Sequence, residues 1–222
     1  MKFNKRSLLF IACGLMVSVS CVSKAEKPAI TSFSASISQM PQSSKVDTAT
    51  FAGGCFWCIE ASFEQINGIY EAISGYAGGN ATDADYSKVS NGQTNHAETV
   101  QIIFNPDQIN YETLLDIFFT AHDPTQLNRQ GPDVGKQYRS VIFYHSEEQK
   151  MNAEMKIKQL TPQFGRKIVT LIDPLEAFYP AEAYHQDYER RNPYQPYVLN
   201  VSRPKIDLVA AKFKNILKPT NK

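Results

Sequence analysis

The fold of this chain is decided by Thr48-Ala-Thr-Phe-Ala-Gly-Gly-Cys55-Phe-Trp-Cys58-Ile-Glu-Ala-Ser-Phe-Glu-Gln-Ile66. Residues 48–52 have the composition of a short strand, and the two glycines that follow permit tight backbone geometry. Residues 55–66 predict a helix, because Ile59, Phe63 and Ile66 fall on one of its faces. The stretch therefore predicts a strand, a glycine turn and a helix that begins with two thiols one turn apart.

The rest of the chain alternates between strand-like and helix-like segments. Its patterns predict strands at 69–76, 99–104, 139–144 and 168–171, and helices at 111–121, 146–160, 182–190 and 204–217. Ser146 and Gln149 fit a capping box at the start of one of these helices. The first six elements, β-α-β-β-α-β, match a ferredoxin-like split βαβ core. We therefore predict an α+β fold, an α/β sandwich whose helices, including extra C-terminal ones, pack on one sheet.

Size and charge limit the number of domains and the kinds of partner. The chain has 222 residues, of which 42% are hydrophobic, so it can form one good-sized core but not several large domains. Its formal net charge is +1, and no long run of like charges occurs. A nucleic-acid surface needs clustered Lys and Arg, so we expect no nucleic-acid partner, and we expect a monomer.

The N-terminal residues predict export. Lys2, Lys5 and Arg6 precede an apolar run at 8–19 that is too short for a comfortable membrane span. Signal peptidase cleavage after Ala25 and lipid attachment at Cys21 both fit the sequence, and an uncleaved anchor helix is a third alternative. We expect residues 1–25 to be a signal peptide or lipoprotein signal, 26–47 a linker and 48–222 the folded domain. Each alternative places the protein in the bacterial periplasm or on a membrane that faces it.

Export leaves two of the four cysteines in the folded domain. Cys13 lies in the signal and Cys21 is either removed or lipidated, so Cys55 and Cys58 remain. A structural disulfide between them would close a very small loop and stabilise the fold little, which favours a redox role. The positive end of the helix dipole favours a thiolate at Cys55, and Cys58 follows on the same face. We assign attack to Cys55 and resolution to Cys58, and the alternative for Cys58 is a small buried hydrophobe.

Residues 53–60, Gly-Gly-Cys-Phe-Trp-Cys-Ile-Glu, resemble the nucleophile motif of the peptide methionine sulfoxide reductase A family. The family pattern is Gly-Cys-Phe-Trp with a Glu nearby. Further blocks resemble the family in the same order: Tyr-Ser-Lys-Val at 86–89 with Gly-Gln-Thr-Asn-His-Ala-Glu at 92–98, Gln-Gly-Pro-Asp-Val-Gly-Lys-Gln-Tyr-Arg-Ser at 130–140, and Ala-Glu-Ala-Tyr-His-Gln-Asp-Tyr at 181–188. The resemblance covers about residues 48–200.

This resemblance implies a reaction and a set of site residues. It implies that the Cys55 thiolate attacks the sulfur of methionine S-sulfoxide, free or in proteins, while Glu98 gives a proton to the oxygen. Methionine then leaves, and Cys55 remains as a sulfenic acid. The other implied residues are hydrogen-bond donors to that oxygen and a cage for the methyl group: Tyr86 and Tyr138, and Phe56 and Trp57. The chemistry is coherent, because burial raises the pKa of a carboxyl and a sulfenic acid condenses with a nearby thiol.

Several alternatives stay open. Asp133 either shapes the site or forms a turn with Pro132. His185 is left out of the catalytic set, and the scattered histidines offer no zinc spacing, so we expect no metal and no bound cofactor. No cysteine follows Cys58. Either Cys58 resolves the sulfenic acid and a thioredoxin-like protein or dithiol reduces the disulfide, or an external thiol reduces the sulfenic acid directly.

Two other functions compete with repair of oxidised exported proteins. A general dithiol-disulfide oxidoreductase also uses Cys-x-x-Cys at a helix start. The segments around Glu98 and Tyr138 count against it, since such an enzyme needs no proton donor for an oxygen. The other rival is a secreted interaction domain without catalytic activity.

Overall fold

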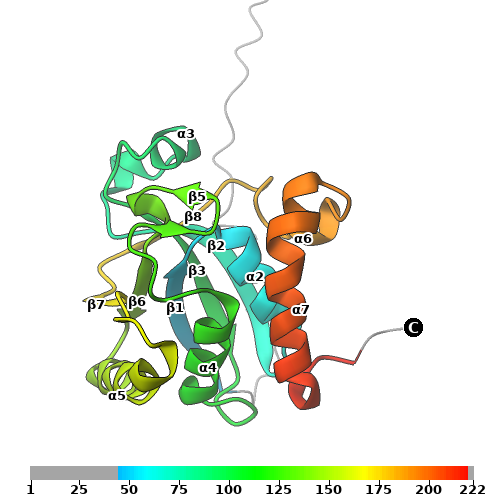
Figure 1. Cartoon of the computed structure of the whole chain (residues 1–222). Helices are drawn as coiled ribbons and strands as arrows, with labels where there is room; N and C mark the ends of the chain where they lie inside the picture. The colour runs from blue at the N-terminus through cyan, green and yellow to red at the C-terminus, as the bar shows by residue number, and fades with distance from the viewer. Residues whose placement is uncertain (1–44, 220–222) are drawn as a thin grey trace, which may run out of the picture.

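A computed structural model describes residues 45–219 (Figure 1). Its centre is a six-stranded sheet in the order β7-β6-β1-β3-β2-β8. Neighbouring strands are antiparallel, except that β6 and β7 are parallel. The strands are β1 (Asp47–Gly53), β2 (Ile69–Ala77), β3 (Ala97–Phe104), β6 (Ser140–Tyr144), β7 (Leu171–Pro174) and β8 (Phe178–Pro180).

The four central strands form two interlocked split βαβ units. β1 and β2 are connected by helix α2 (Phe56–Glu64), and β3 is inserted between them. In the same way, β3 and β6 are connected by helix α4 (Tyr111–Ala121), and β1 lies between them. The predicted α+β fold with a ferredoxin-like core is therefore confirmed.

The strand register decides which residues surround the end of β1. Phe51 lies opposite Val100 of β3, so the same antiparallel register, continued by two residues, brings Gly53 opposite Glu98. On the other side of β1, Gly53 lies opposite Ser140 of β6. The turn that follows Gly53 therefore meets the beginnings of both neighbouring strands.

Helices α2, α4 and α7 (Arg203–Lys212) lie on one face of the sheet, in front of it in Figure 1, and pack against one another. Because alternate residues of a strand point to opposite faces, this face supplies one large apolar core. Phe51 is fully buried there and stacks on Phe63 of α2 and Phe118 of α4. Its neighbour Ala52 belongs to a smaller apolar cluster on the other face. Packing on both faces fixes the end of β1.

The longest helix, α5 (Glu147–Phe164), packs against α4, β6 and β7. The Ser146 hydroxyl accepts a hydrogen bond from the Gln149 backbone N–H at 3.2 Å, which confirms the predicted helix start. The helix runs four residues beyond its predicted end at residue 160. It stops at Gly165, whose left-handed conformation (φ 60°) is a common helix terminator.

Short elements that the sequence pattern does not reveal carry part of the site. They are α3 (Tyr86–Ser90), the strands β4 (Arg129–Gln130) and β5 (Asp133–Val134), and the 3-10 turns Ala81–Asp83 and Lys136–Tyr138. Segments of two to five residues are too short for a hydrophobic period to mark them. All of them lie in the connections that lead into β3 and β6.

The region between β6 and α7 differs most from the predictions. The strand predicted at 168–171 is β7, which begins only at Leu171, and the three-residue edge strand β8 has no counterpart among the predictions. The helix predicted at 182–190 is wrong for most of its length, since only α6 (Tyr188–Arg191) is helical. The Gln186 side chain bonds the backbone of Ser74 on β2, and Asp187 adopts a positive φ of 54°. These tertiary contacts override the local helix preference.

The C-terminal helix is shorter than the predicted 204–217. A π-helical turn, Val198–Ser202, leads into α7, and a 3-10 turn, Lys214–Ile216, follows it. α7 begins with Arg203 and Pro204, and a proline in the first turn is well tolerated because its missing N–H has no helical partner.

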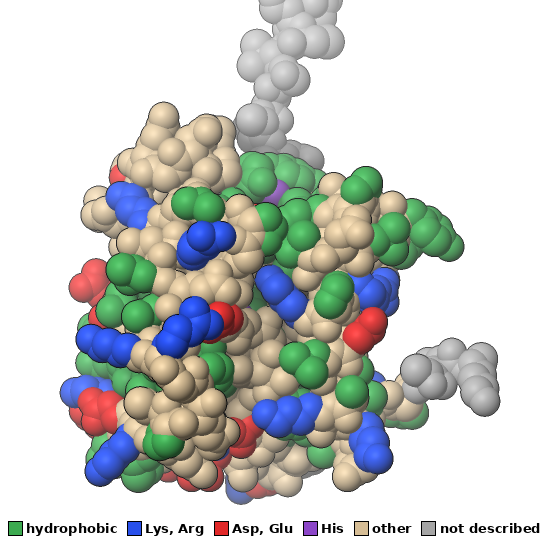
Figure 2. All heavy atoms as spheres, viewed as in Figure 1, with side chains coloured by type: hydrophobic (Ala, Val, Ile, Leu, Met, Phe, Trp, Pro, Cys, Tyr) green, Lys and Arg blue, Asp and Glu red, His purple; other side chains and the backbone are tan. Residues whose placement is uncertain are grey.

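The surface of the described residues mixes both signs of charge. Figure 2 shows Lys and Arg side chains interspersed with Asp and Glu on the viewed face, and apolar side chains gathered near α6. Within residues 45–219, no helix combines the length and apolarity needed to cross a bilayer. The predicted export signal and Cys21 lie outside the described residues, as does most of the predicted linker.

Candidate active site

Cys55 lies where β1 turns into α2. It occupies the N-cap position of α2, which begins one residue later than predicted. Gly54 precedes it with a φ of 98°, and a Cβ at this position would lie 2.6 Å from the side chain of Gln130. The turn therefore requires glycine on both conformational and steric grounds. Cys55 is only 6% exposed, and Cys58, one turn later, is 1% exposed.

Glu98 is a buried carboxyl next to this turn. One of its oxygens, Oε2, accepts a hydrogen bond from the backbone N–H of Phe56 at 3.1 Å. Burial raises the pKa of Glu98 to about 8, the Phe56 bond opposes this shift, and the nearby charge of Asp133 adds to it. At neutral pH the structure therefore holds a protonated carboxylic acid beside Cys55.

Cys58, and not Cys55 as predicted, is the thiol with the lowered pKa. Burial raises the pKa of Cys55, and the neighbouring Cys58 and Glu98 raise it further. The prediction that the helix start favours a thiolate at Cys55 is therefore wrong for the site without substrate. The hydrogen bond from Cys55 lowers the pKa of Cys58 from 9.0 to about 7 against its own burial, and Lys205 and Ser202 contribute. Cys58 is therefore the more acidic of the two thiols.

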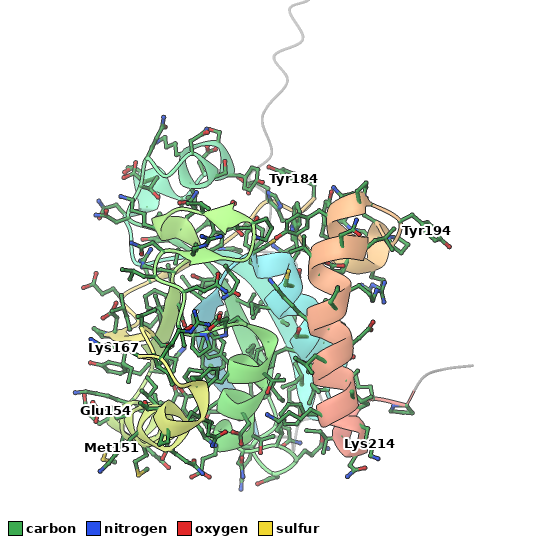
Figure 3. All side chains as sticks on the ribbon, viewed as in Figure 1. Met151, Glu154, Lys167, Tyr184, Tyr194 and Lys214 are labelled. Carbon is green, nitrogen blue, oxygen red and sulfur yellow. The ribbon has the colours of Figure 1, made fainter. Side chains whose placement is uncertain are left out.

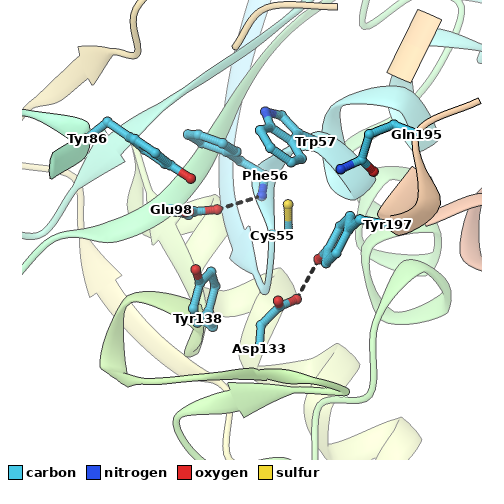
Figure 4. Close-up of a pocket in the computed structure, with 9 residues that line it drawn as sticks. All are labelled: Cys55, Phe56, Trp57, Tyr86, Glu98, Asp133, Tyr138, Gln195 and Tyr197. Carbon is cyan, nitrogen blue, oxygen red and sulfur yellow. Dashed lines mark hydrogen bonds between the residues drawn. The ribbon is translucent and has the colours of Figure 1, made fainter. Parts of the chain in front are cut away.

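Cys55 opens into a cavity of about 210 Å³ that most of the predicted site residues line. Figure 4 shows Cys55 at the centre of this cavity, with Tyr86, Glu98 and Tyr138 on one side of it and Trp57 and Tyr197 on the other. Burial raises the pKa of Tyr86 to about 12 and also raises the pKa of Tyr138, so both hydroxyls stay protonated. The complete lining is Cys55, Phe56, Trp57, Tyr86, Glu98, Asp133, Tyr138, Gln195 and Tyr197.

Two of these lining residues lie outside the predicted set. Tyr197 donates a hydrogen bond to Asp133 Oδ2 at 2.5 Å, which links the loop after α6 to β5 (Figure 4). Asp133 therefore both follows the turn at Gly131-Pro132 and shapes the cavity. Gln195 and Tyr197 lie in an irregular segment, Asn-Pro-Tyr-Gln-Pro-Tyr at 192–197, whose only signal is its richness in proline and tyrosine.

His185 holds the indole of Trp57. The Trp57 Nε1–H donates to His185 Nδ1 at 3.1 Å, and because an indole nitrogen can only donate, the histidine proton lies on Nε2. Burial lowers the pKa of His185 to about 4, so the ring is neutral. Tyr188 stacks on the other side of Trp57 with a centroid separation of 3.7 Å. His185 thus orients the cavity wall and does not itself line the cavity.

Two glutamates, Glu182 and the buried Glu60, hold the elements around the cavity together. Glu182 accepts hydrogen bonds from the Tyr76 hydroxyl and from the Tyr86 backbone N–H, so it fixes the start of α3. Glu60 accepts from the Ser74 hydroxyl and from the Asp187 backbone N–H. Glu60, the glutamate of the Gly-Cys-Phe-Trp motif, therefore ties α2 to β2 and to the loop before α6.

Comparison with known proteins agrees with this geometry. A family model described as peptide methionine sulfoxide reductase matches residues 47–217. The chain belongs to the peptide methionine sulfoxide reductase family. Family members from Nautilia profundicola and Thermus thermophilus are 51% and 49% identical to it, and each match covers 78% of this chain and 98% of the relative.

Solved structures of this reductase family share the fold. Mxr1 from Saccharomyces cerevisiae in its reduced form matches with a TM-score of 0.65 and 36% identity over 70% of this chain and 93% of Mxr1. Methionine sulfoxide reductase A of Corynebacterium diphtheriae matches with a TM-score of 0.62 and 32% identity, over 68% of this chain and 78% of its own.

Trp57 is the only tryptophan, so its fluorescence reports on the cavity of this reductase. Because the pKa of His185 is lowered to about 4, we expect a change in emission as the pH falls through about 4, separate from any change that Cys58 and Glu98 cause as they titrate near pH 7 and 8. Protonation turns Nδ1 into a donor and breaks the bond from Trp57. A fluorescence titration checks this, with circular dichroism at each pH to identify unfolding. A transition centred near 6.5, the ordinary value of histidine, that disappears in a His185→Gln chain would contradict the assignment.

Proposed function

We propose that this oxidoreductase reduces methionine S-sulfoxide, free or in proteins, to methionine through a sulfenic acid on Cys55. The observation that carries the proposal is the pairing of a buried, protonated Glu98 with a thiol in a small aromatic cavity. A sulfoxide oxygen leaves sulfur only when it is protonated, and a carboxyl whose pKa is about 8 can supply that proton at neutral pH.

The proposed reaction forms and breaks bonds in two stages. The Cys55 sulfur attacks the sulfoxide sulfur while Glu98 protonates the oxygen, and the Cys55 thiol proton restores the Glu98 carboxyl. The hydroxyl then passes to the Cys55 sulfur as the thioether leaves, so the sulfoxide is reduced to methionine and Cys55 is oxidised to a sulfenic acid. Tyr86 and Tyr138 keep their protons and stabilise the charge that develops on the oxygen.

The dimensions and lining of the cavity fit a side chain as substrate. A cavity of about 210 Å³ is smaller than the 300–1,000 Å³ typical of drug-sized ligands, so it suits the end of one methionine sulfoxide side chain. Phe56 and Trp57 offer apolar surfaces for the terminal methyl group, and His185 fixes the Trp57 ring. We assign Asp133 and Tyr197 to shaping the wall opposite Tyr86.

Cys58 is proposed to resolve the sulfenic acid. It lies one helical turn from Cys55, and both residues are free thiols in the structure. Attack by Cys58 forms the Cys55–Cys58 disulfide and releases water, and a thioredoxin-like protein or a dithiol then restores both thiols. A general dithiol oxidoreductase would not need the buried acid or the tyrosines that converge on Cys55.

We further propose that the protein acts as an exported monomer that repairs oxidised proteins in the periplasm. The support is the basic start and apolar run of residues 2–19, together with a folded domain that begins at Asp47. Mass spectrometry of the mature N-terminus tests this, because export predicts either a chain that starts at Glu26 or a lipid on an N-terminal Cys21. An intact, unmodified Met1 would leave only the uncleaved anchor of the three alternatives, and recovery of the protein in the cytosolic fraction alone would contradict export.

Replacement of Glu98 by Gln is expected to slow methionine formation by about 10²- to 10⁴-fold, the usual contribution of a positioned acid. In the wild type, the rate of methionine formation should fall as the pH rises through about 8, because the carboxyl then loses the proton that it must donate. The Glu98→Gln chain has no such group, so its rate should not fall in this pH range, and this basic limb of the pH profile should disappear. Single-turnover release of methionine, measured across pH, checks both effects.

The matched control is Glu154→Gln on α5, which Figure 3 shows at the opposite end of the molecule from Tyr184. This exposed residue should be replaceable without effect on rate or pH profile. If the rate of the Glu98→Gln chain still falls as the pH rises through about 8, Glu98 is not the proton donor.

Replacement of Cys58 by Ser should leave the first methionine release intact and abolish the disulfide. After treatment with excess methionine sulfoxide and no reductant, peptide mapping should find a Cys55–Cys58 disulfide in the wild type. In the variant it should find a dimedone adduct of the Cys55 sulfenic acid. Cys55→Ser serves as control and should release no methionine. An intrachain disulfide in the Cys58→Ser chain, or loss of as many free thiols in this chain as in the wild type, would show that Cys58 is not the resolving thiol.

A further inference from the structure

The surroundings of Cys58 are built by the C-terminal part of the chain. Cys58 lies on the side of α2 that faces α7, and its sulfur is 3.2 Å from the Ser202 hydroxyl oxygen. Ser202 is fully buried and occupies the N-cap position of α7. The π-helical turn Val198–Ser202 continues directly into α7, and Ser202 makes no side-chain capping bond there. The Ser202 oxygen accepts a hydrogen bond from the Cys58 thiol, and the same hydroxyl can donate to the sulfur once the thiol is ionised.

A lysine from the first turn of α7 adds a positive charge at the same sulfur. Lys205 Nζ lies 3.9 Å from Cys58 Sγ. Within the described residues, Lys205 forms no ion pair with a carboxylate, and its side-chain ammonium group contacts the Cys58 sulfur. A hydroxyl donor and an ammonium group on one side of a buried sulfur stabilise the thiolate over the thiol.

Other charged groups act on Cys58 from the neighbouring elements. From α6, the charge of Glu189 disfavours the thiolate, and this carboxyl is 5% exposed. Burial raises the pKa of Glu189, and Ser202 and Lys205 act on this carboxyl in the opposite sense as well as on the sulfur. From β3, Glu98 lies within electrostatic reach of Cys58 but is protonated at neutral pH. On α2 itself, Cys55 donates to Cys58. Ser202 and Lys205 are thus the groups on α7 that counter Glu189 and burial.

We propose that Ser202 and Lys205 are positioning residues that hold Cys58 as a thiolate, both as the nucleophile that forms the disulfide and as the leaving group when the disulfide is reduced. This inference rests on the proposed role of Cys58 as the resolving thiol. Ser202 and Lys205 together form the cradle of Cys58.

Disulfide formation benefits from the cradle because only the thiolate attacks. The Cys58 sulfur forms a bond to the Cys55 sulfur, the S–O bond of the sulfenic acid breaks, and the departing hydroxide takes a proton and leaves as water. Cys58 is oxidised and the sulfenic sulfur is reduced. At pH 7, a pKa of about 7 instead of 9.0 makes about half of Cys58 thiolate instead of about one part in a hundred. A thiolate of lower pKa is also intrinsically less nucleophilic, which offsets part of the gain in thiolate fraction. The rate of attack by Cys58 at pH 7 is therefore raised roughly sixfold.

The cradle also sets the direction of disulfide reduction. An incoming thiolate attacks one sulfur of the disulfide, and the other sulfur leaves with the electron pair. Cys55 lines the cavity and is the more exposed of the two, whereas Cys58 is not part of the lining. Because a thiol of lower pKa leaves faster, attack on Cys55 with departure of Cys58 is favoured on both counts. The reductant is thus expected to form its mixed disulfide with Cys55.

The test compares Lys205→Met and Ser202→Ala with Lys205→Arg and with Lys212→Met, which removes an exposed charge from the same helix. In single turnover with methionine sulfoxide, Lys205→Met and Ser202→Ala should release methionine at the wild-type rate. They should form the disulfide roughly two- to tenfold more slowly, and dithiothreitol should reduce it more slowly. Lys205→Arg should recover most of the rate, and Lys212→Met should match the wild type. Equal loss in methionine release and disulfide formation, or no loss in either, would overturn the proposal.

A titration in the Cys55→Ser chain separates this inference from the role of Cys58 in turnover. In that chain, ultraviolet absorbance of the thiolate reports Cys58 with the competing thiol removed. We expect the midpoint to rise by about one pH unit when Lys205→Met is added, because a nearby cation lowers a thiol pKa. An unchanged midpoint would overturn the cradle. Absence of a Cys55–Cys58 disulfide in the wild type would overturn only the proposed resolving role, which the titration does not require.

Discussion

The antiparallel register between β1 and β3 is the constraint on which the site depends. It places the end of β1, and the glycine turn that follows, beside Glu98. Packing of Phe51 against α2 and α4 keeps the strand from slipping, and a slip by one residue would turn Glu98 to the other face of the sheet. The hydrogen bond from the Phe56 N–H then fixes the carboxyl where a substrate oxygen must lie.

Burial creates the chemistry of this site more than any helix dipole does. The same loss of solvent that keeps Glu98 protonated also raises the pKa of Cys55, so the site at rest holds an acid and a protonated thiol. The more acidic thiol is instead Cys58, near Lys205. Donor, nucleophile and resolving thiol therefore have distinct protonation states, set by where each lies relative to α2, β3 and α7.

The core of the fold was predictable from sequence patterns, whereas the cavity wall was predictable only through family resemblance, and Gln195 and Tyr197 were not predicted at all. The 48–66 stretch and the patterns at 69–76, 99–104 and 111–121 predict the central strands and helices, because these elements are long enough to show a period. Glu98, Tyr86 and Tyr138 came from family resemblance, since no local pattern distinguishes them from other acids and tyrosines. The helix predicted at 182–190 fails because Glu182, His185 and Gln186 bond to distant residues, and Tyr197 reaches the cavity from an irregular loop.

The central claim is that Cys55 and Glu98 act together on a sulfoxide held in one orientation by Phe56, Trp57, Tyr86 and Tyr138. A cavity with an acid on one side and an apolar cage on the other can bind only one arrangement of oxygen and methyl group around the chiral sulfur. The most direct measurement is turnover of the two separated epimers of methionine sulfoxide with a dithiol reductant. The account predicts that the S epimer is reduced and that the R epimer is not. Equal rates on both epimers would contradict it.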